Sequence, residues 1–323
     1  MKSSLLFSAL LSAGAHAAEV LPGIPWDDTD GNRLQAHGGG LVVEGDTYYL
    51  IGENKTSREG NEAGSSFNSV ACYQSTNLLD WEFVNDLLSV DPSVPDLAED
   101  RLIERPKVVY NENTSQYVMW MHVDSTDYAD AKAGVATSDS VCGDYTYIES
   151  VNPMDNQSRD MTLFVDNDGT GYLISEDRDE GTHFYKLSDD YLTIDSDVGT
   201  IGADWMPGLE SPAVVNVDGV YYFFGSQLTG WSPNENQYTT ADSLAGPWAE
   251  AAYFAPEGTN TCTSQTTYVL PAGNGTFMYM GDRWLSDTLW DSQYIWLPLT
   301  IDSSSRTASM ECVDSWDTSE IGL

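Results

Sequence analysis

The chain has 323 residues, with 13 lysines and arginines against 51 aspartates and glutamates, and its formal net charge is −38 at pH 7. Such a charge repels nucleic acid and anionic membrane surfaces, so we expect neither as a partner. A neutral polymer remains compatible with it, and the chain has no stretch of about 20 apolar residues that would predict a membrane-spanning helix.

Residues 1–17 have the pattern of a secretory signal peptide. Lys2 supplies the positive charge, Leu5 to Leu11 form a short apolar segment, and Ala15-His16-Ala17 matches the small-residue cleavage site. We therefore expect a secreted, extracellular protein. Its mature part, residues 18–323, is expected to be a single catalytic domain.

An even number of cysteines in a secreted chain predicts disulfides. Four cysteines form two bonds in one of three connectivities, and the sequence leaves the choice open. We favour Cys72–Cys142 and Cys262–Cys312, because each pair would join neighbouring or terminal segments. Four Asn-x-Ser/Thr sequons are typical of a secreted glycoprotein, and they lie at Asn54, Asn113, Asn156 and Asn274.

Short runs rich in Val, Ile, Tyr, Phe and Trp alternate with Gly, Asn, Asp and Ser clusters, as is typical of strands and turns. One unit recurs five times: a polar residue, an apolar pair four and five positions later, and an aromatic strand after a turn. In chain order the units begin at His37, Glu104, Asp160, Glu210 and Gln265. Outer strand patterns follow each, so a unit offers about four strands. Five such units predict an all-β five-bladed β-propeller, whereas a two-sheet jelly roll gives no reason for a fivefold repeat.

The innermost strands of a propeller line its central channel, so the five leading polar residues are expected to form a ring. Three of them are the carboxylates Glu104, Asp160 and Glu210. Like charges in a low-dielectric funnel raise one another's pKa, so one carboxyl can stay protonated while another is ionised. Glycosidic-bond cleavage needs such a pair. The alternative is that these residues only cap inner strands and bind water in the channel.

Ten motifs extend over nearly the whole mature chain, and they are Gln35-Ala36-His37-Gly38-Gly39-Gly40, Gly52-Glu53-Asn54-Lys55, Glu104-Arg105-Pro106-Lys107-Val108, Tyr117-Val118-Met119-Trp120, Ser158-Arg159-Asp160, Leu209-Glu210-Ser211-Pro212-Ala213, Thr229-Gly230-Trp231-Ser232-Pro233-Asn234, Gly246-Pro247-Trp248, Ser264-Gln265 and Tyr279-Met280-Gly281-Asp282-Arg283-Trp284. In these motifs the sequence resembles glycoside hydrolase family 43, and most closely its exo-β-1,3-galactanase branch (subfamily 24). The resemblance implies an inverting hydrolase on a five-bladed propeller. The chain stops about where the fifth unit ends, so we expect no additional carbohydrate-binding module.

By this resemblance Glu210 is the general acid, and Asp160 orients it and tunes its pKa. The usual base of the family is an Asp that follows a His in the first unit, but Gly38 occupies that position here. Two candidates for water activation remain. Gln265 can hold a water and is assigned the base role in this branch, while Glu104 is a carboxylate and therefore a competent base. We expect Gln265 to position the water with Glu104 close by.

The resemblance further implies which residues bind the terminal galactose: Glu53, Tyr128, Asp160, Thr229 and Trp231. Trp231 lies in a Gly-Trp-Ser-Pro loop and offers a flat apolar face to the sugar. Some family members hold calcium in the channel, where His37 is a possible metal or water ligand. No Asp-x-Asp-x-Asp loop is evident, so we expect neither a metal nor another cofactor.

The expected activity is the release of galactose from β-1,3-galactan, the neutral backbone of arabinogalactans, by a monomer. An α-L-arabinofuranosidase or β-xylosidase is the second interpretation, and the absence of an Asp at Gly38 argues against it. A carbohydrate-binding propeller that has lost catalysis together with its base is the third.

Overall fold

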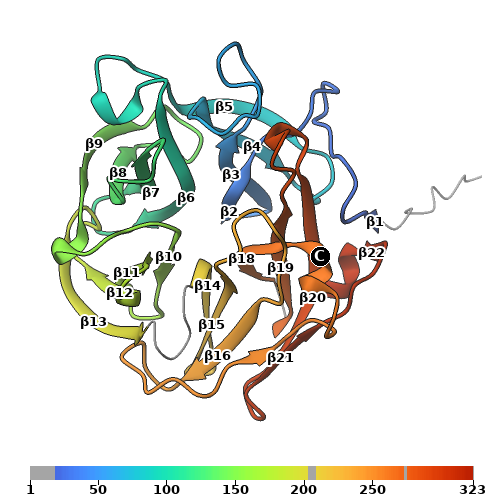
Figure 1. Ribbon diagram of the computed structural model, residues 1–323. Coiled ribbons are helices and arrows are strands. Elements are labelled where there is room, and N and C mark those ends of the chain that lie inside the picture. The colour runs from blue at the N-terminus through green and yellow to red at the C-terminus, as the bar shows by residue number, and fades with distance from the viewer. Residues whose placement is uncertain (1–18, 203–208, 273–274, 323) are drawn as a thin grey trace, which may run out of the picture.

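A computed structural model of the protein describes residues 19–202, 209–272 and 275–322. The predicted signal peptide and the sequon at Asn274 lie outside these ranges. Five four-stranded antiparallel sheets are arranged around a common axis (Figure 1). The fold is a five-bladed β-propeller, which confirms the prediction from the repeat. No helix among the described residues is long and apolar enough to cross a membrane.

The strands of each blade follow one another in sequence order from the axis outward. Their bounds, blade by blade, are β2 (His37–Glu44), β3 (Thr47–Asn54), β4 (Ser69–Ser75) and β5 (Glu82–Ser89); β6 (Arg101–Asn111), β7 (Gln116–Ser125), β8 (Lys132–Ser138) and β9 (Thr146–Val151); β10 (Met161–Val165), β11 (Gly171–Asp177), β12 (Gly181–Leu187) and β13 (Ile194–Gly202); β14 (Leu209–Val217), β15 (Val220–Gln227), β16 (Gln237–Ala241) and β17 (Ala252–Tyr253); β18 (Gln265–Pro271), β19 (Phe277–Arg283), β20 (Gln293–Asp302) and β21 (Thr307–Met310). Short helical turns are α1 (Asn260–Thr263), η1 (Pro95–Leu97), η2 (Pro153–Asp155), η4 (Leu289–Asp291) and η5 (Thr318–Ile321).

The two ends of the described chain meet beside the fifth blade. β1 (Glu19–Val20) pairs with β22 (Trp316–Asp317), and Val20 lies opposite Trp316. Trp316 donates its indole N–H to the carbonyl oxygen of Trp296 at 2.8 Å. These contacts complete the circle of blades, because the first and last blades then share one apolar cluster.

The interior between blades is apolar and rich in aromatic side chains. Trp81, Trp120 and Trp296 are each almost fully buried. Disulfides add covalent links at two places. Cys72 is bonded to Cys142, and Cys262 is bonded to Cys312, which confirms the favoured pairing.

Four of the five innermost strands carry a β-bulge close after the polar residue that opens the repeat. The register shifts lie between His37 and Gly40, Glu104 and Lys107, Glu210 and Ala213, and Thr266 and Tyr268. A bulge inserts an extra residue and re-aims the side chains beside it. The repeated sequence pattern therefore accompanies a bend in four of the five blades, at the end of the channel where the innermost strands begin.

Candidate active site

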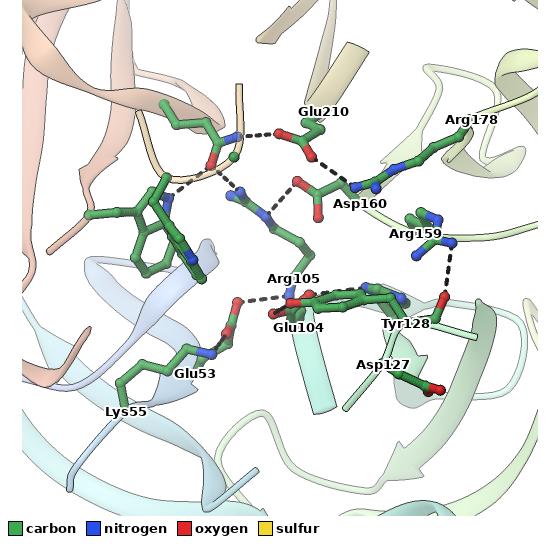
Figure 2. A pocket seen from close by; sticks show the side chains of 15 residues that line it. Glu53, Lys55, Glu104, Arg105, Asp127, Tyr128, Arg159, Asp160, Arg178 and Glu210 are labelled. Atoms are coloured by element: carbon green, nitrogen blue, oxygen red, sulfur yellow. Dashed lines mark hydrogen bonds and ion pairs between the residues drawn. The ribbon is translucent and has the colours of Figure 1, made fainter. Parts of the chain in front are cut away.

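One cavity of about 400 Å³ opens at this end of the channel, and side chains from all five blades line it (Figure 2). Its size is within the usual range of small-molecule sites. Seven of the eight residues predicted for the site line it: Glu53, Glu104, Tyr128, Asp160, Glu210, Trp231 and Gln265. The structure therefore brings these residues together, and their individual roles remain predictions.

Thr229 is the predicted site residue that does not line this cavity. Its hydroxyl donates to the carbonyl oxygen of Ser232 at 2.5 Å and accepts a hydrogen bond from Asn234 at 2.8 Å. The Thr229 hydroxyl is thus engaged within its own loop. That loop presents Gly230 and Trp231 to the cavity.

His37 is also displaced from the expected ring. Its side chain is fully buried, with Nδ1 3.1 Å from Asp282 Oδ1 and its ring stacked on Tyr294 at 4.8 Å between centroids. It does not line the cavity. Four of the five predicted residues therefore form the ring, and His37 lies behind it in contact with Asp282 and Tyr294.

Glu210, at the start of β14, is held through both carboxyl oxygens. Arg178 Nη2 lies 3.2 Å from Oε1, and the side-chain amide of Gln265 donates to Oε2 at 3.2 Å (Figure 2). Burial raises the pKa of Glu210 to about 8, with further contributions from the negative charges of Asp160 and Glu176 that outweigh the opposing cations Arg105 and Arg178. Glu210 can therefore remain protonated at neutral pH, as a general acid must.

Asp160, directly before β10, is fixed by the neighbouring blades. Its Oδ2 accepts hydrogen bonds from the backbone N–H and the hydroxyl of Ser211, at 3.0 and 2.9 Å. Arg105 Nε lies 3.1 Å from the same oxygen. Because Ser211 follows Glu210 in the chain, these contacts fix Asp160 relative to Glu210.

Glu104, on β6, has the opposite electrostatic environment. Tyr128 donates its hydroxyl to Oε1 at 3.0 Å, and His122 Nδ1 lies 3.2 Å from Oε2. Burial alone would raise the pKa of Glu104, but His122, Lys55 and Tyr128 together lower it to about 2. Between about pH 2 and pH 8, therefore, Glu104 is ionised while Glu210 is protonated.

His122 links Glu104 to a second carboxylate deeper in the blade. Its Nε2 lies 2.8 Å from Asp124 Oδ2, and the imidazole is almost completely buried. Burial lowers the pKa of His122, but the contacts with Asp124 and Glu104 outweigh it and raise that pKa to about 9. The imidazolium therefore carries a positive charge between two carboxylates.

Gln265, at the start of β18, has all four hydrogen-bonding positions occupied. Its amide nitrogen donates to Glu210 and, at 2.9 Å, to the hydroxyl of Ser226. Its amide oxygen accepts from Arg105 Nη2 at 2.6 Å and from Trp284 Nε1 at 2.8 Å. Two donors on the oxygen and two acceptors on the nitrogen fix the orientation of the amide.

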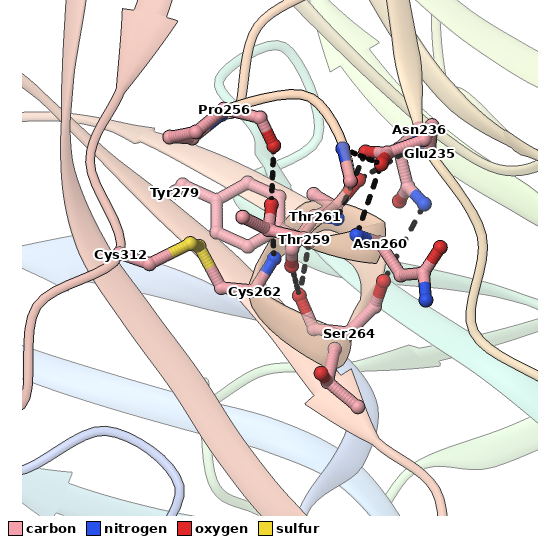
Figure 3. The surroundings of a disulfide bond; sticks show 12 residues. Glu235, Asn236, Pro256, Thr259, Asn260, Thr261, Cys262, Ser264, Tyr279 and Cys312 are labelled. Atoms are coloured by element: carbon pink, nitrogen blue, oxygen red, sulfur yellow. Dashed lines mark hydrogen bonds between the residues drawn. A yellow bond between two sulfur atoms is a disulfide. The ribbon is translucent and has the colours of Figure 1, made fainter.

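An unusual turn beside the Cys262–Cys312 disulfide precedes Gln265 in the chain (Figure 3). The four residues of α1, Asn260–Thr263, all have positive φ between 50° and 58°, a conformation that non-glycine residues rarely adopt. The carboxylate of Glu235 accepts hydrogen bonds from the backbone N–H groups of Gly258, Asn260 and Thr261. Glu235 and the Cys262–Cys312 disulfide thus hold a strained turn immediately before Gln265.

The sequence interpretation missed several residues that line the cavity, and these are Lys55, Arg105, His122, Asp127, Arg159, Arg178, Gly230 and Trp284. Most stand beside predicted residues in the motifs already noted, so adjacency was the available signal. Five cationic side chains line the cavity, namely Lys55, Arg105, His122, Arg159 and Arg178. They face five carboxyl groups, of which Glu210 is protonated at neutral pH. The cavity is therefore nearly charge-balanced despite the acidic chain, which suits a neutral ligand.

Glu104, His122 and Asp160 offer ligand atoms within 4.8 Å of one another, close enough to hold a metal ion. Each already has a partner, however: Tyr128 for Glu104, Asp124 for His122, and Arg105 for Asp160. Cationic side chains supply the positive charge that an ion would bring. We assign no metal to this group.

The comparisons with known proteins agree with this geometry. A model of glycosyl hydrolases family 43 matches residues 40–286. The solved structure of an exo-β-1,3-galactanase from Phanerochaete chrysosporium with β-1,3-galactotriose has a TM-score of 0.86 and 38% identity, over 93% of this chain and 68% of that chain. The structure of an exo-β-1,3-galactanase from Clostridium thermocellum has a TM-score of 0.83 and 36% identity, over 92% of this chain and 66% of that chain. The structure of a family 43 β-1,3-galactosidase with galactodeoxynojirimycin has a TM-score of 0.83 and 32% identity, over 92% of this chain and 100% of that chain. The search among curated proteins gave no match.

Proposed function

The chain belongs to glycosyl hydrolase family 43 and is a glycoside hydrolase, and from this premise we propose that it is an exo-β-1,3-galactanase. In this proposal it releases galactose from the β-1,3-galactan backbone of arabinogalactans with inversion at the anomeric carbon. The observation that carries the proposal is the paired environment of Glu210 and Glu104, whose pKa values are shifted in opposite directions. Similar solved structures are exo-β-1,3-galactanases, which supports the choice of substrate.

In the proposed mechanism, protonated Glu210 donates its proton to the glycosidic oxygen as the bond to the leaving galactan breaks. Asp160 keeps that carboxyl protonated through its charge and fixes it through Ser211. The ionised Glu104 stabilises positive charge on the sugar ring and accepts hydrogen bonds from its hydroxyl groups. Trp231, 44% exposed and edge-on to Trp284 at 5.6 Å, offers an apolar face for the sugar's C–H surface.

Water activation in this proposal depends on position more than on basicity. The low pKa of Glu104 makes it a weak base, and an amide such as Gln265 is weaker still. An oxocarbenium-like transition state reduces the demand for a strong base, because the leaving group has largely departed before water attacks. We therefore assign Gln265 to hold the nucleophilic water, and the ionised Glu104 nearby to take up the proton that this water loses as it bonds to the anomeric carbon.

The direct contact between Gln265 and Glu210 must change when substrate binds. Inversion places the acid and the water-activating group on opposite faces of the sugar, about 6.5–9.5 Å apart. The Gln265 amide nitrogen lies only 3.2 Å from Glu210. We propose that the bound galactose displaces this contact and that Arg105 and Trp284 keep the amide oriented.

We also propose that the protein is secreted and acts as a monomer. The signal-peptide pattern of residues 1–17 and two disulfides support an oxidising compartment. Detection of a chain that begins near Ala18 in the medium of expressing cells would test secretion. A chain retained in the cytoplasm with residues 1–17 attached would contradict it.

Incubation with debranched β-1,3-galactan tests the activity. Wild-type protein should release galactose as the first product, and Glu210→Gln should release at least about 10²-fold less, since general acids contribute about 10²–10⁴-fold. Release of larger oligosaccharides would contradict exo action. Turnover of nitrophenyl arabinofuranoside or xyloside without galactan cleavage would favour the other activities of the family, and binding without any turnover would favour a lectin-like propeller.

A further inference from the structure

The second strand of each blade carries one residue opposite the polar residue of the inner strand. In four blades this second-strand residue makes a polar contact with an innermost strand. Asp282 contacts His37, His122 contacts Glu104, Ser226 accepts from Gln265, and Glu53 accepts from the backbone N–H of Arg105. The third blade has a residue at the same second-strand position.

Glu176 is that counterpart, on β11 opposite Asp160. Met161 pairs with Ser175, and one step further Glu176 donates its backbone N–H to the carbonyl oxygen of Asp160 at 2.9 Å. The Glu176 side chain has an exposed fraction of 0%. Among the residues that the structure describes, none forms a hydrogen bond with its Oε2, and its Oε1 lies 3.3 Å from Arg178 Nε.

Arg178 connects Glu176 to the proposed acid. The same guanidinium places Nη2 3.2 Å from Glu210 Oε1, and Figure 2 shows this contact at the edge of the cavity. The Arg178 side chain is 43% exposed, so little packing fixes its long stem. The contact with Glu176 at one end of the guanidinium therefore orients the other end toward Glu210.

The charges around the two carboxyls come from several elements. Glu210 faces Asp160 and Glu176, which are negative, and Arg105 and Arg178, which are positive. Glu176 faces Asp160 on the negative side, and on the positive side Arg178, His122 and Arg159. Glu176 and Arg178 thus form one ion pair, and their charges shift the pKa of Glu210 in opposite directions.

We propose that Glu176 is a positioning residue for the hydrolytic reaction, which anchors Arg178 against Glu210 and offsets its positive charge so that the acid keeps its proton. Arg178 orients the Glu210 carboxyl by a charged hydrogen bond, which by itself would favour the ionised and inactive form. The buried negative charge of Glu176 counters that effect. The pair therefore combines orientation of the acid with retention of its proton.

The environment of Glu176 agrees with this role. Burial, and then the charge of Asp160, raise the pKa of Glu176 to about 7, against the cations around it. A residue that served only to fill the interior of the blade would be apolar, since a buried carboxyl with an unpartnered oxygen is costly. Here the carboxyl is retained, and Arg178 is its ion-pair partner among the described residues.

This role rests on the proposed function, and two substitutions of opposite sign test it. Glu176→Gln keeps an acceptor for Arg178 but removes the negative charge, so the alkaline limb of kcat against pH on β-1,3-galactotriose should move about one unit lower. Arg178→Gln removes the cation, so that limb should move higher. Glu180→Gln makes the same chemical change at an exposed residue nearby and should leave the limb in place.

A second measurement needs no substrate and separates the two proposals. The titration of the Glu210 carboxyl carbon can be followed by NMR on chains containing ¹³C-labelled glutamate, with its signal assigned by its loss in Glu210→Gln. In Glu176→Gln the pKa of Glu210 should fall, and thermal unfolding should confirm that the variant is folded. A Glu210 titration and alkaline limb at their wild-type positions in folded Glu176→Gln would overturn the role of Glu176. Wild-type protein that cleaves no galactotriose, while the Glu210 titration still moves in the variant, would count against the proposed function alone.

Discussion

A side chain at Gly38 would overlap with Glu53, because a Cβ built there would collide with Glu53 Oε1 and lie 3.2 Å from Glu53 Cδ. Gly38 occupies the position where the family resemblance places the usual Asp base. Its φ of 58° is not itself decisive, since the equivalent residues Arg105 and Ser211 have φ of 53° and 58°. The carboxylate of Glu53 fills the space that the missing side chain would need.

Gly38→Asp should therefore reduce activity instead of supplying a base. The new side chain must displace Glu53, which accepts a hydrogen bond from the backbone N–H of Arg105 and forms an ion pair with Lys55. We expect a loss of about 10²-fold or more in kcat/KM and a lower unfolding temperature, because large buried-site disruptions cost a few kcal/mol. The matched control is Gly45→Asp, in an exposed turn with open space around its Cβ. Higher activity in Gly38→Asp would contradict the account of this position.

Asp160→Asn should shift the pH dependence of activity toward acid. Glu210 acts in its protonated form, so activity falls as pH rises through its pKa of about 8. Removing the charge of Asp160 makes ionisation of Glu210 easier, so the alkaline limb of kcat should move about one pH unit lower. Asp195→Asn, at an exposed position of the same blade, should leave the limb unchanged. A shift toward alkaline pH would mean that Asp160 does not hold the proton on Glu210.

Gln265→Glu tests whether the amide itself is required. One carboxylate oxygen can still accept from Arg105 and Trp284, but the other would face Glu210 without a proton to donate. We expect kcat on β-1,3-galactotriose to fall about 10²-fold and the alkaline limb to move to higher pH, because the new negative charge raises the pKa of Glu210. An unchanged or faster rate would indicate a simple base position.

Glu235→Gln should reduce catalysis although Glu235 is outside the cavity. Its two carboxylate oxygens accept three backbone N–H groups of the left-handed turn before Gln265 (Figure 3). A glutamine offers only one acceptor oxygen, so we expect a loss of about 1–3 kcal/mol in the free energy of unfolding. Displacement of Gln265 should lower kcat more than it changes KM. Glu257→Gln, at an exposed neighbour, is the control, and a destabilised variant with wild-type kcat would refute the link to Gln265.

The propeller and most of the ring could be predicted from the sequence because one local pattern repeats in every blade. A polar residue four positions before an apolar pair is visible without knowledge of tertiary structure. The disulfide pairing was favoured for another reason, namely that each pair would join neighbouring or terminal segments, and the structure has Cys72–Cys142 and Cys262–Cys312.

The second-strand partners could not be predicted, because the bulges change the register. Counted back from the pair Asn111 and Gln116, an unbroken ladder would place Val123 opposite Glu104. The bulge shifts the register by one residue and brings His122 there instead. A shift of one residue exchanges the two faces of a strand, so a charged group replaces an apolar one.

The ion pairs of the cavity depend on contacts between blades, which a local pattern does not specify. Arg105 follows Glu104 in the chain yet reaches Asp160 in the third blade and Gln265 in the fifth. Arg178 lies just beyond β11 and reaches Glu210 in the fourth blade. His37 was expected in the ring for the same local reason, but Asp282 and Tyr294 of the fifth blade hold it behind the cavity.

The most direct test of the central claim is the anomeric form of the first galactose released from β-1,3-galactotriose, followed by ¹H NMR within the first minutes. An inverting exo-enzyme with Glu210 as its acid should produce α-galactose first, and the β-anomer should then grow only as fast as mutarotation allows. Initial release of β-galactose would contradict inversion.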